Sequence, residues 1–248
     1  MQPLTDLRVA IGFLTRVPVG DVSRGDPSLV RVAAAVPWFP IVGATIGLFH
    51  AGVWRGLVEV MAPLPAAAVA TAAALLVTGA FHHDGLADMA DAFGGGWTIE
   101  QRFEILKDSR LGTYGTSALA MALIVEVAAV SELSPANGAW ALIGAHAVGR
   151  AGAVLTMIVA PVATDGLGAT YVTDLSKPAA FLGIAIAVAV AVATSPVLAL
   201  WPLVAALTAT AATVGLAIRK IGGFTGDVLG AITVVATITY LVITGALV

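Results

Sequence analysis

The segment FHHDGLADMADAFGGG, residues 81–96, places three aspartates and two histidines directly after a long apolar run. Asp84, Asp88 and Asp91 stand at i, i+4 and i+7, so in a helix their side chains fall within about 60° of one another. Carboxylates this close repel one another and raise one another's pKa unless a cation neutralises them. The pattern therefore predicts a metal site; the alternative is a solvated helix end whose acids only mark the membrane border.

The chain contains no cysteine, so any metal must be held by oxygen or imidazole. Oxygen ligands favour Mg²⁺, Mn²⁺ or Ca²⁺, and Mg²⁺ often joins one or two carboxylates to substrate phosphate oxygens. The acidic helix is therefore suited to phosphoryl transfer. The glycines at 94–96 are expected either to form a phosphate-binding nest of backbone N–H groups or to be a flexible loop.

Two further segments carry charges that suit a diphosphate. Lys107 and Arg110 stand three residues apart, and a point charge beside a planar guanidinium matches two linked phosphates. The alternative for these two residues is a basic cluster that only fixes membrane topology. Asp227 opens the last apolar segment and is either the N-cap of a helix or another ligand for metal or nucleotide.

Three ionisable residues lie inside expected membrane spans. His146 and Arg150 share a helix face at i and i+4, and an ionisable group within a span is a functional candidate. Arg150 needs an anionic partner, for which Glu126 and a substrate phosphate are the candidates. We expect His146 to be a satisfied core residue, and His50 to lie near the external border without a role.

The composition indicates a membrane protein. Of 248 residues, 59% are hydrophobic and 11% charged, whereas soluble domains carry about 25% charged residues. The net charge of −3 gives no reason to expect a nucleic-acid partner. We predict one membrane-embedded catalytic domain over residues 1–248, folded as an all-α polytopic helix bundle.

Apolar runs long enough for a bilayer predict seven spans. They cover roughly residues 33–54, 64–82, 113–133, 137–161, 178–195, 197–217 and 228–248. Leu4, Leu7, Ile11 and Leu14 recur at helical spacing and predict an N-terminal helix lying in the membrane interface.

Positive charge predicts the orientation of these spans. Threading them puts ten basic residues on one side, which the positive-inside rule makes cytoplasmic. These ten are Arg8, Arg16, Arg24, Arg31, Arg102, Lys107, Arg110, Lys177, Arg219 and Lys220. The N-terminus and the loops that carry the candidate site are therefore expected in the cytoplasm.

Four stretches together resemble the adenosylcobinamide-GDP ribazoletransferase family, also called cobalamin (5′-phosphate) synthase. They are FLTRVPV at 13–19, TGAFHHDGLADMADAFGGG at 78–96, ILKDSRLGTYG at 105–115 and GGFTGDVLGA at 222–231. The resemblance implies a Mg²⁺-dependent enzyme of the inner membrane. A hydroxyl of α-ribazole, or of its 5′-phosphate, would attack the phosphate attached to adenosylcobinamide, so that GMP leaves and adenosylcobalamin or its 5′-phosphate forms.

The resemblance also implies roles for the residues that match the family's motifs. Asp91, His82, Lys107 and Arg110 would be catalytic, with Asp91 a further metal ligand or the general base. Substrate would be bound by Ser109, Asp108, Arg150, Thr225 and Gly226. The metal would be held by Asp84, Asp88, Asp91 and Asp227. His83 falls on a variable position of the motif and is given no role.

Other functions remain open at this stage. A membrane phosphotransferase that acts on a lipid head group would share the metal chemistry and differ only in its acceptor. A transporter is a weaker alternative, because its ionisable residues would gather near the bilayer midplane. The expected partners are the two substrates and the lipid bilayer, and a homo-oligomer is also compatible with the sequence.

Overall fold

The computed structural model describes residues 3–21, 32–164, 169, 172–194 and 199–247, and within them the fold is helical. The prediction of an all-α polytopic membrane protein is confirmed. The helices, in chain order, are α1 (Pro3–Leu14), α2 (Val32–Ala35), η2 (Val36–Trp38), α3 (Phe39–Leu57), α4 (Pro63–Thr78), α5 (Phe81–Gly95), α6 (Ile99–Leu106), α7 (Thr113–Ser131), α8 (Gly138–Val159), α10 (Lys177–Thr194), α11 (Leu200–Ile221) and α12 (Gly226–Gly245).

Each of the seven expected spans coincides with a helix, but the helices differ in length. Five segments of the described chain are long and apolar enough to cross a bilayer: Val32–Leu57 and helices α7, α8, α11 and α12. Counting α4 and α5 together as one bent unit gives a sixth. The apolar part of α10, Lys177–Ala193, is shorter than these.

The span expected over residues 64–82 ends earlier than predicted. Helix α4 stops at Thr78, and α5 leaves it at an angle of 90°. Gly79 and Ala80 both adopt left-handed backbone conformations, with φ of 63° and 55°, and so break the helix. Arg16 packs on Gly79 where a Cβ would stand, which explains glycine there. Because α5 has only 15 residues and carries three aspartates, it is not itself a membrane-spanning segment.

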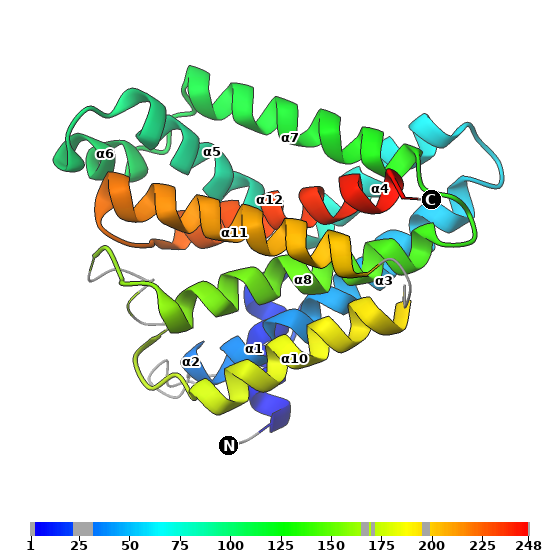
Figure 1. Ribbon diagram of the computed structural model, residues 1–248, viewed down its shortest axis with the longest axis horizontal. Helices are drawn as coiled ribbons and strands as arrows, with labels where there is room; N and C mark the ends of the chain where they lie inside the picture. Colours follow the sequence, from blue (N-terminus) through cyan, green and yellow to red (C-terminus); the bar gives the residue numbers. More distant parts are fainter. Residues whose placement is uncertain (1–2, 22–31, 165–168, 170–171, 195–198, 248) are drawn as a thin grey trace.

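Helix α8 is the central element of the bundle and packs against α3, α10, α11 and α12 (Figure 1). Small residues allow this close approach. A Cβ on Gly47 of α3 would lie 2.6 Å from the backbone oxygen of Leu142, and one on Gly43 would collide with the backbone oxygen of His146. The polar residues of α8 are therefore enclosed by protein on several sides.

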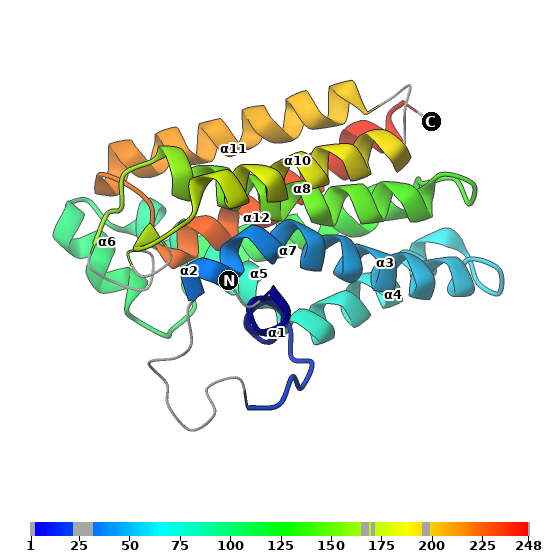
Figure 2. The same ribbon diagram turned by 90° about the horizontal axis from the view of Figure 1, so that it is seen from below.

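The predicted N-terminal helix is present as α1, which lies beside α3 and is seen almost along its axis in Figure 2. Its buried face contains Val9, Ala10 and Leu14, whereas Leu4 is 78% exposed. The expected apolar stripe is thus only partly buried in the bundle. Phe13 of the same helix stacks on Phe39 of α3 with ring centroids 5.6 Å apart.

The loops that carry the candidate site gather at one end of the molecule. Helix α6 and the turn between α11 and α12 lie at that end, and the C-terminus lies at the opposite end (Figure 1). Two of the ten basic residues used for the predicted orientation, Arg24 and Arg31, lie outside the described residues.

Candidate active site

The candidate site forms where α5 and α12 touch through glycines. A Cβ on Gly85 would lie 2.9 Å from the backbone oxygen of Asp227, and one on Gly230 would lie 3.1 Å from that of His82. Because neither helix has a side chain at the contact, their backbones approach closely. The contact brings Asp227, far away in the sequence, beside the acidic helix.

The aspartates act on one another electrostatically. Burial, and then the charges of Asp84, Asp227 and Asp91, raise the pKa of Asp88 from 3.8 to about 6. The contributions of Asp84 and Asp91 are the mutual repulsion that the spacing predicts, and a bound cation would relieve it. The donor set consists of carboxylate oxygens, which fits Mg²⁺.

The separation of the aspartates limits how many can bind one ion. Among the described residues, the one group of three or more possible metal ligands whose atoms all lie within 4.8 Å is His50, Glu126 and His146. No three aspartates meet that criterion within the described chain. Since Mg²⁺ usually takes only one or two carboxylates from the protein, a pair from the acidic helix and α12 is sufficient.

Asp91 has a different environment from Asp84 and Asp88. It is buried, and its two carboxylate oxygens accept hydrogen bonds from the backbone N–H groups of Gly112 at 2.7 Å and Gly115 at 2.8 Å. These N–H groups belong to the first turn of α7, whose orphan donors need an acceptor. Asp91 therefore anchors the loop 107–112 to α5. Its predicted roles as base or metal ligand stay predictions.

The basic loop lies at the exposed end of the site. The guanidinium of Arg110 donates to both oxygens of Asp108, at 2.9 and 3.0 Å from Nε, and this bond lowers the pKa of Asp108 to about 2. Lys107 and Ser109 are exposed. The loop is open to a charged ligand, but Arg110 holds Asp108 in this conformation.

The glycines at 94–96 do not form the nest that was one expectation. Gly94 and Gly95 lie within α5, and the N–H of Gly96 bonds to the oxygen of Ala92. A Cβ on Gly94 would lie 2.5 Å from the ring of Tyr114. Close packing, and neither a nest nor a loop, is therefore what requires glycine here.

The start of α12 corrects another expectation. The N-cap is Thr225 rather than Asp227: its hydroxyl accepts from the N–H of Val228 at 3.4 Å and donates to Asp227 Oδ2 at 3.3 Å. Asp227 thus lies in the first turn with its carboxylate oriented by Thr225. Of the two expectations for Asp227, the N-cap is therefore wrong, and the role of ligand stays a prediction.

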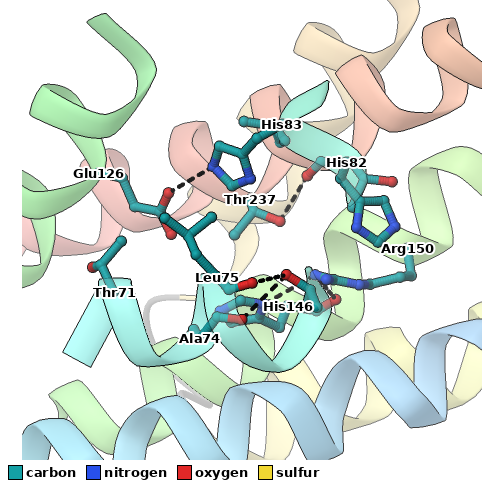
Figure 3. A pocket seen from close by; sticks show the side chains of 12 residues that line it. Thr71, Ala74, Leu75, His82, His83, Glu126, His146, Arg150 and Thr237 are labelled. Carbon is teal, nitrogen blue, oxygen red and sulfur yellow. Dashed lines mark hydrogen bonds and ion pairs between the residues drawn. The ribbon is translucent and has the colours of Figure 1, made fainter. Parts of the chain in front are cut away.

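Behind the aspartates lies a buried polar cluster, shown in Figure 3 around a cavity of about 30 Å³. His83 Nε2 donates to the Glu126 carboxylate at 3.3 Å, joining α5 to α7. Arg150 Nη1 lies 2.9 Å from His146 Nδ1, and Arg150 Nε has no hydrogen-bond partner in the part of the chain that the structure describes. No carboxylate of the described residues lies within 4.0 Å of Arg150, so Glu126 is not its direct partner.

A second cavity of about 30 Å³ lies next to this one and is also bordered by the N-terminal motif. It is lined by Phe13, Phe39 and Phe81 on one side, and by His82, Arg150 and Gly226 on the other. The ring of Phe13 also meets that of Phe81 edge-on, with centroids 5.2 Å apart. His82 and Arg150 border both cavities, so the predicted catalytic and substrate-binding residues meet there.

Comparison with known proteins decides the family. The model of the family described as "Cobalamin-5-phosphate synthase" matches residues 6–245. Proteins named adenosylcobinamide-GDP ribazoletransferase are similar over nearly the whole chain. The protein of Bradyrhizobium diazoefficiens is 38% identical over 98% of this chain and 94% of its own length, that of Azorhizobium caulinodans 38% over 96% and 94%, and that of Shewanella pealeana 35% over 93% and 90%.

The chain belongs to the cobalamin-5-phosphate synthase family. The resemblance stated from its four motifs is confirmed, and so is the class of enzyme, a transferase of cobalamin synthesis. The family assignment also removes the transporter alternative. No solved structure matches the chain.

Sequence reasoning missed residues that this cobalamin-synthase fold brings to the site. His50, expected near the external border, is fully buried and lies 3.1 Å from His146, and His83, given no role, pairs with Glu126. A histidine within an apolar helix was the available signal for His50. Two more bonds join neighbouring helices to the end of α11. Arg102 Nη1 of α6 donates to the backbone oxygen of Lys220 at 2.8 Å, and Lys220 Nζ donates to that of Phe93 on α5 at 3.3 Å.

Proposed function

We propose that this chain joins adenosylcobinamide-GDP to α-ribazole, or to α-ribazole 5′-phosphate, in a Mg²⁺-dependent transfer that releases GMP. The observation that carries the proposal is the convergence of Asp84, Asp88 and Asp227 at the α5–α12 contact, in a chain of this family. Phosphoryl-type transfer depends mainly on positioning and charge neutralisation, which carboxylates, a cation and basic residues provide.

The aspartates at the helix contact would hold the cation. Within the described residues, no pair of backbone N–H groups holds the carboxylates of Asp84, Asp88 and Asp227 as one holds Asp91. Burial and the neighbouring aspartates raise the pKa of Asp88. When bound there, Mg²⁺ would supply positive charge to the phosphate oxygens. Asp227 is already oriented by Thr225, and Gly226 beside it borders the cavity that reaches Arg150.

The basic residues would bind the diphosphate from two directions. Arg150 is a buried cation with no carboxylate within 4.0 Å among the described residues, and it would receive a phosphate oxygen at the inner side. Lys107, Ser109 and Arg110 would bind the diphosphate from its guanosine side. Asp108 would orient the Arg110 guanidinium or release it to the ligand. Bound between these residues, the reacting phosphate would be shielded from water on the side of the buried Arg150.

The reaction forms one phosphorus–oxygen bond and breaks another. The acceptor hydroxyl attacks the phosphate attached to adenosylcobinamide, its proton passes to a base, and the bond to GMP breaks. His82, buried beside Arg150, and Asp91 are the two candidates for the base. Because Asp91 already accepts two N–H bonds, accepting a proton there would require one of them to lengthen.

The apolar helices also support a location. We propose that the chain lies in the inner membrane with the α6 end, and therefore the site, facing the cytoplasm. The excess of basic residues at that end supports this orientation. The polar diphosphate would then be reached from the aqueous side.

The test is an assay of purified protein reconstituted in liposomes. Adenosylcobinamide-GDP and α-ribazole are added with Mg²⁺ or with EDTA, and GMP and cobalamin are followed together. We expect equal amounts of both products with Mg²⁺, none with EDTA, and loss of turnover in Asp88→Asn. Glu132→Gln is the matched control, because it removes an exposed carboxylate just beyond the far end of α7. Folded wild-type protein that forms neither product would refute the proposal.

A further inference from the structure

Four polar side chains from three helices form a continuous chain inside the bundle. Arg150 Nη1 lies 2.9 Å from His146 Nδ1, and His146 Nε2 lies 3.1 Å from His50 Nδ1. His50 Nε2 lies 3.5 Å from the hydroxyl of Thr71 on α4. All four side chains are buried, with His50 fully enclosed.

The direction of every hydrogen bond in this chain follows from its first member. A guanidinium can only donate, so His146 Nδ1 must accept from Arg150. A neutral His146 then carries its proton on Nε2 and donates it to His50 Nδ1. His50 in turn carries its proton on Nε2, where it faces the Thr71 oxygen. The two histidines are therefore held in one tautomer each.

We propose that His50 is a positioning residue for Arg150, acting through His146. This hydrogen-bond chain holds the guanidinium ready for an anionic phosphate of the substrate. This inference rests on the proposed function, in which Arg150 binds that phosphate. The hydrogen-bond chain orients Arg150 with neutral imidazoles, whereas a carboxylate would have neutralised the charge of the guanidinium. The positive charge stays available, since no carboxylate of the described residues lies within 4.0 Å of Arg150, and among those residues its Nε has no hydrogen-bond partner.

A metal ion is the competing explanation for the same histidines, because the ligand atoms of His50, Glu126 and His146 all lie within 4.8 Å of one another. Arg150 argues against it. A metal on Nε2 of His146 would leave the ring proton on Nδ1, facing the N–H of Arg150 at 2.9 Å. Glu126 is also engaged by His83. The hydrogen-bond chain satisfies these groups without such a conflict.

Two substitutions of His50 separate positioning from packing. His50→Leu fills the space but leaves the N–H of His146 without an acceptor, whereas His50→Asn places an amide oxygen near the former Nδ1. In the reconstituted assay we expect His50→Leu to raise the KM for adenosylcobinamide-GDP about tenfold to a hundredfold, the usual effect of one unpaired buried donor. The KM for α-ribazole, which has no phosphate, and kcat should change little, and His50→Asn should restore most of the loss.

Thr244→Val is the matched control for disturbing a buried polar residue. Among the described residues its hydroxyl bonds only to the Tyr240 oxygen, at 2.8 Å, at the end of α12 opposite Asp227. The kinetic constants of this variant should equal those of the wild type. Equal KM values in His50→Leu and wild type would overturn the inference. A fall in kcat alone, unrescued by His50→Asn, would overturn it as well.

Nitrogen NMR tests the chain without any reaction. The protein has four histidines, so selective ¹⁵N-histidine labelling in liposomes gives few signals. We expect His50 and His146 to be neutral with the proton on Nε2, and Arg150→Met to release His146 from that tautomer. A proton on His146 Nδ1, or one Zn²⁺ per chain after dialysis against Zn²⁺ that is lost in His50→Leu, would refute the inference. An inactive wild type with the expected tautomers would instead refute only the proposed function.

Discussion

Replacing Asp91 with Asn tests whether this residue anchors the basic loop or takes part directly in chemistry. The substitution keeps the shape of the side chain but leaves one oxygen. One of the two N–H groups, of Gly112 or Gly115, would then face an amide NH₂ instead of an acceptor. The first turn of α7 would lose its anchor to α5.

The expected cost follows from these contacts. One hydrogen bond to a charged group is lost, about 1.5–3 kcal/mol, and the other becomes neutral, about 1 kcal/mol less. The lost negative charge at a helix N-terminus adds about 0.3–1 kcal/mol. Together these give about 3–5 kcal/mol for local opening of the turn, which is about a hundredfold or more in its equilibrium constant.

Hydrogen–deuterium exchange of the reconstituted protein measures this opening directly. Amides of Gly112–Thr116 should exchange about a hundredfold faster in Asp91→Asn, and not in Asp84→Asn, which removes the same charge from an exposed position of α5. Gly115→Ala should reproduce the faster exchange, because its Cβ would collide with the Asp91 carboxylate. Unchanged exchange together with lost turnover in Asp91→Asn would refute the anchoring role and favour Asp91 as the base.

Two more predictions concern the α5–α12 contact. Mg²⁺ binds the ionised carboxylate, and the pKa of Asp88 is about 6. The Mg²⁺ concentration for half-maximal turnover should therefore be about fourfold higher at pH 5.5 than at pH 7.5. A pH-independent value would show that Asp88 does not bind the ion. Gly85→Ala places a Cβ 2.9 Å from a backbone oxygen and should cost about 1–3 kcal/mol of stability and most of the turnover. Gly215→Ala, where nothing lies within 4 Å of the added Cβ, should leave turnover unchanged and raise the Tm slightly; equal effects of the two substitutions would contradict the close approach of the helices.

Much of the fold could be predicted from local patterns. Each of the seven predicted apolar runs coincides with a helix of the described residues, because a chain in lipid must satisfy its backbone within each helix. The break at Gly79–Ala80 was missed, since a left-handed alanine depends on what packs around it rather than on its own preference. Gly94 was misread for a similar reason: the ring of Tyr114, which leaves no room for a Cβ there, comes from another helix.

The sequence by itself determined a polytopic helical membrane protein with aspartates on one helix face, and its motifs determined the family. Those properties depend on residue spacing within one segment and on the hydrophobicity of the chain. Only the tertiary structure decided that Asp227 joins Asp88, that Asp91 holds the start of α7, and that His50 reaches Arg150 through His146. These contacts join residues far apart in the chain, and they depend on helix packing at Gly85, Gly230 and Gly47, which no local pattern specifies.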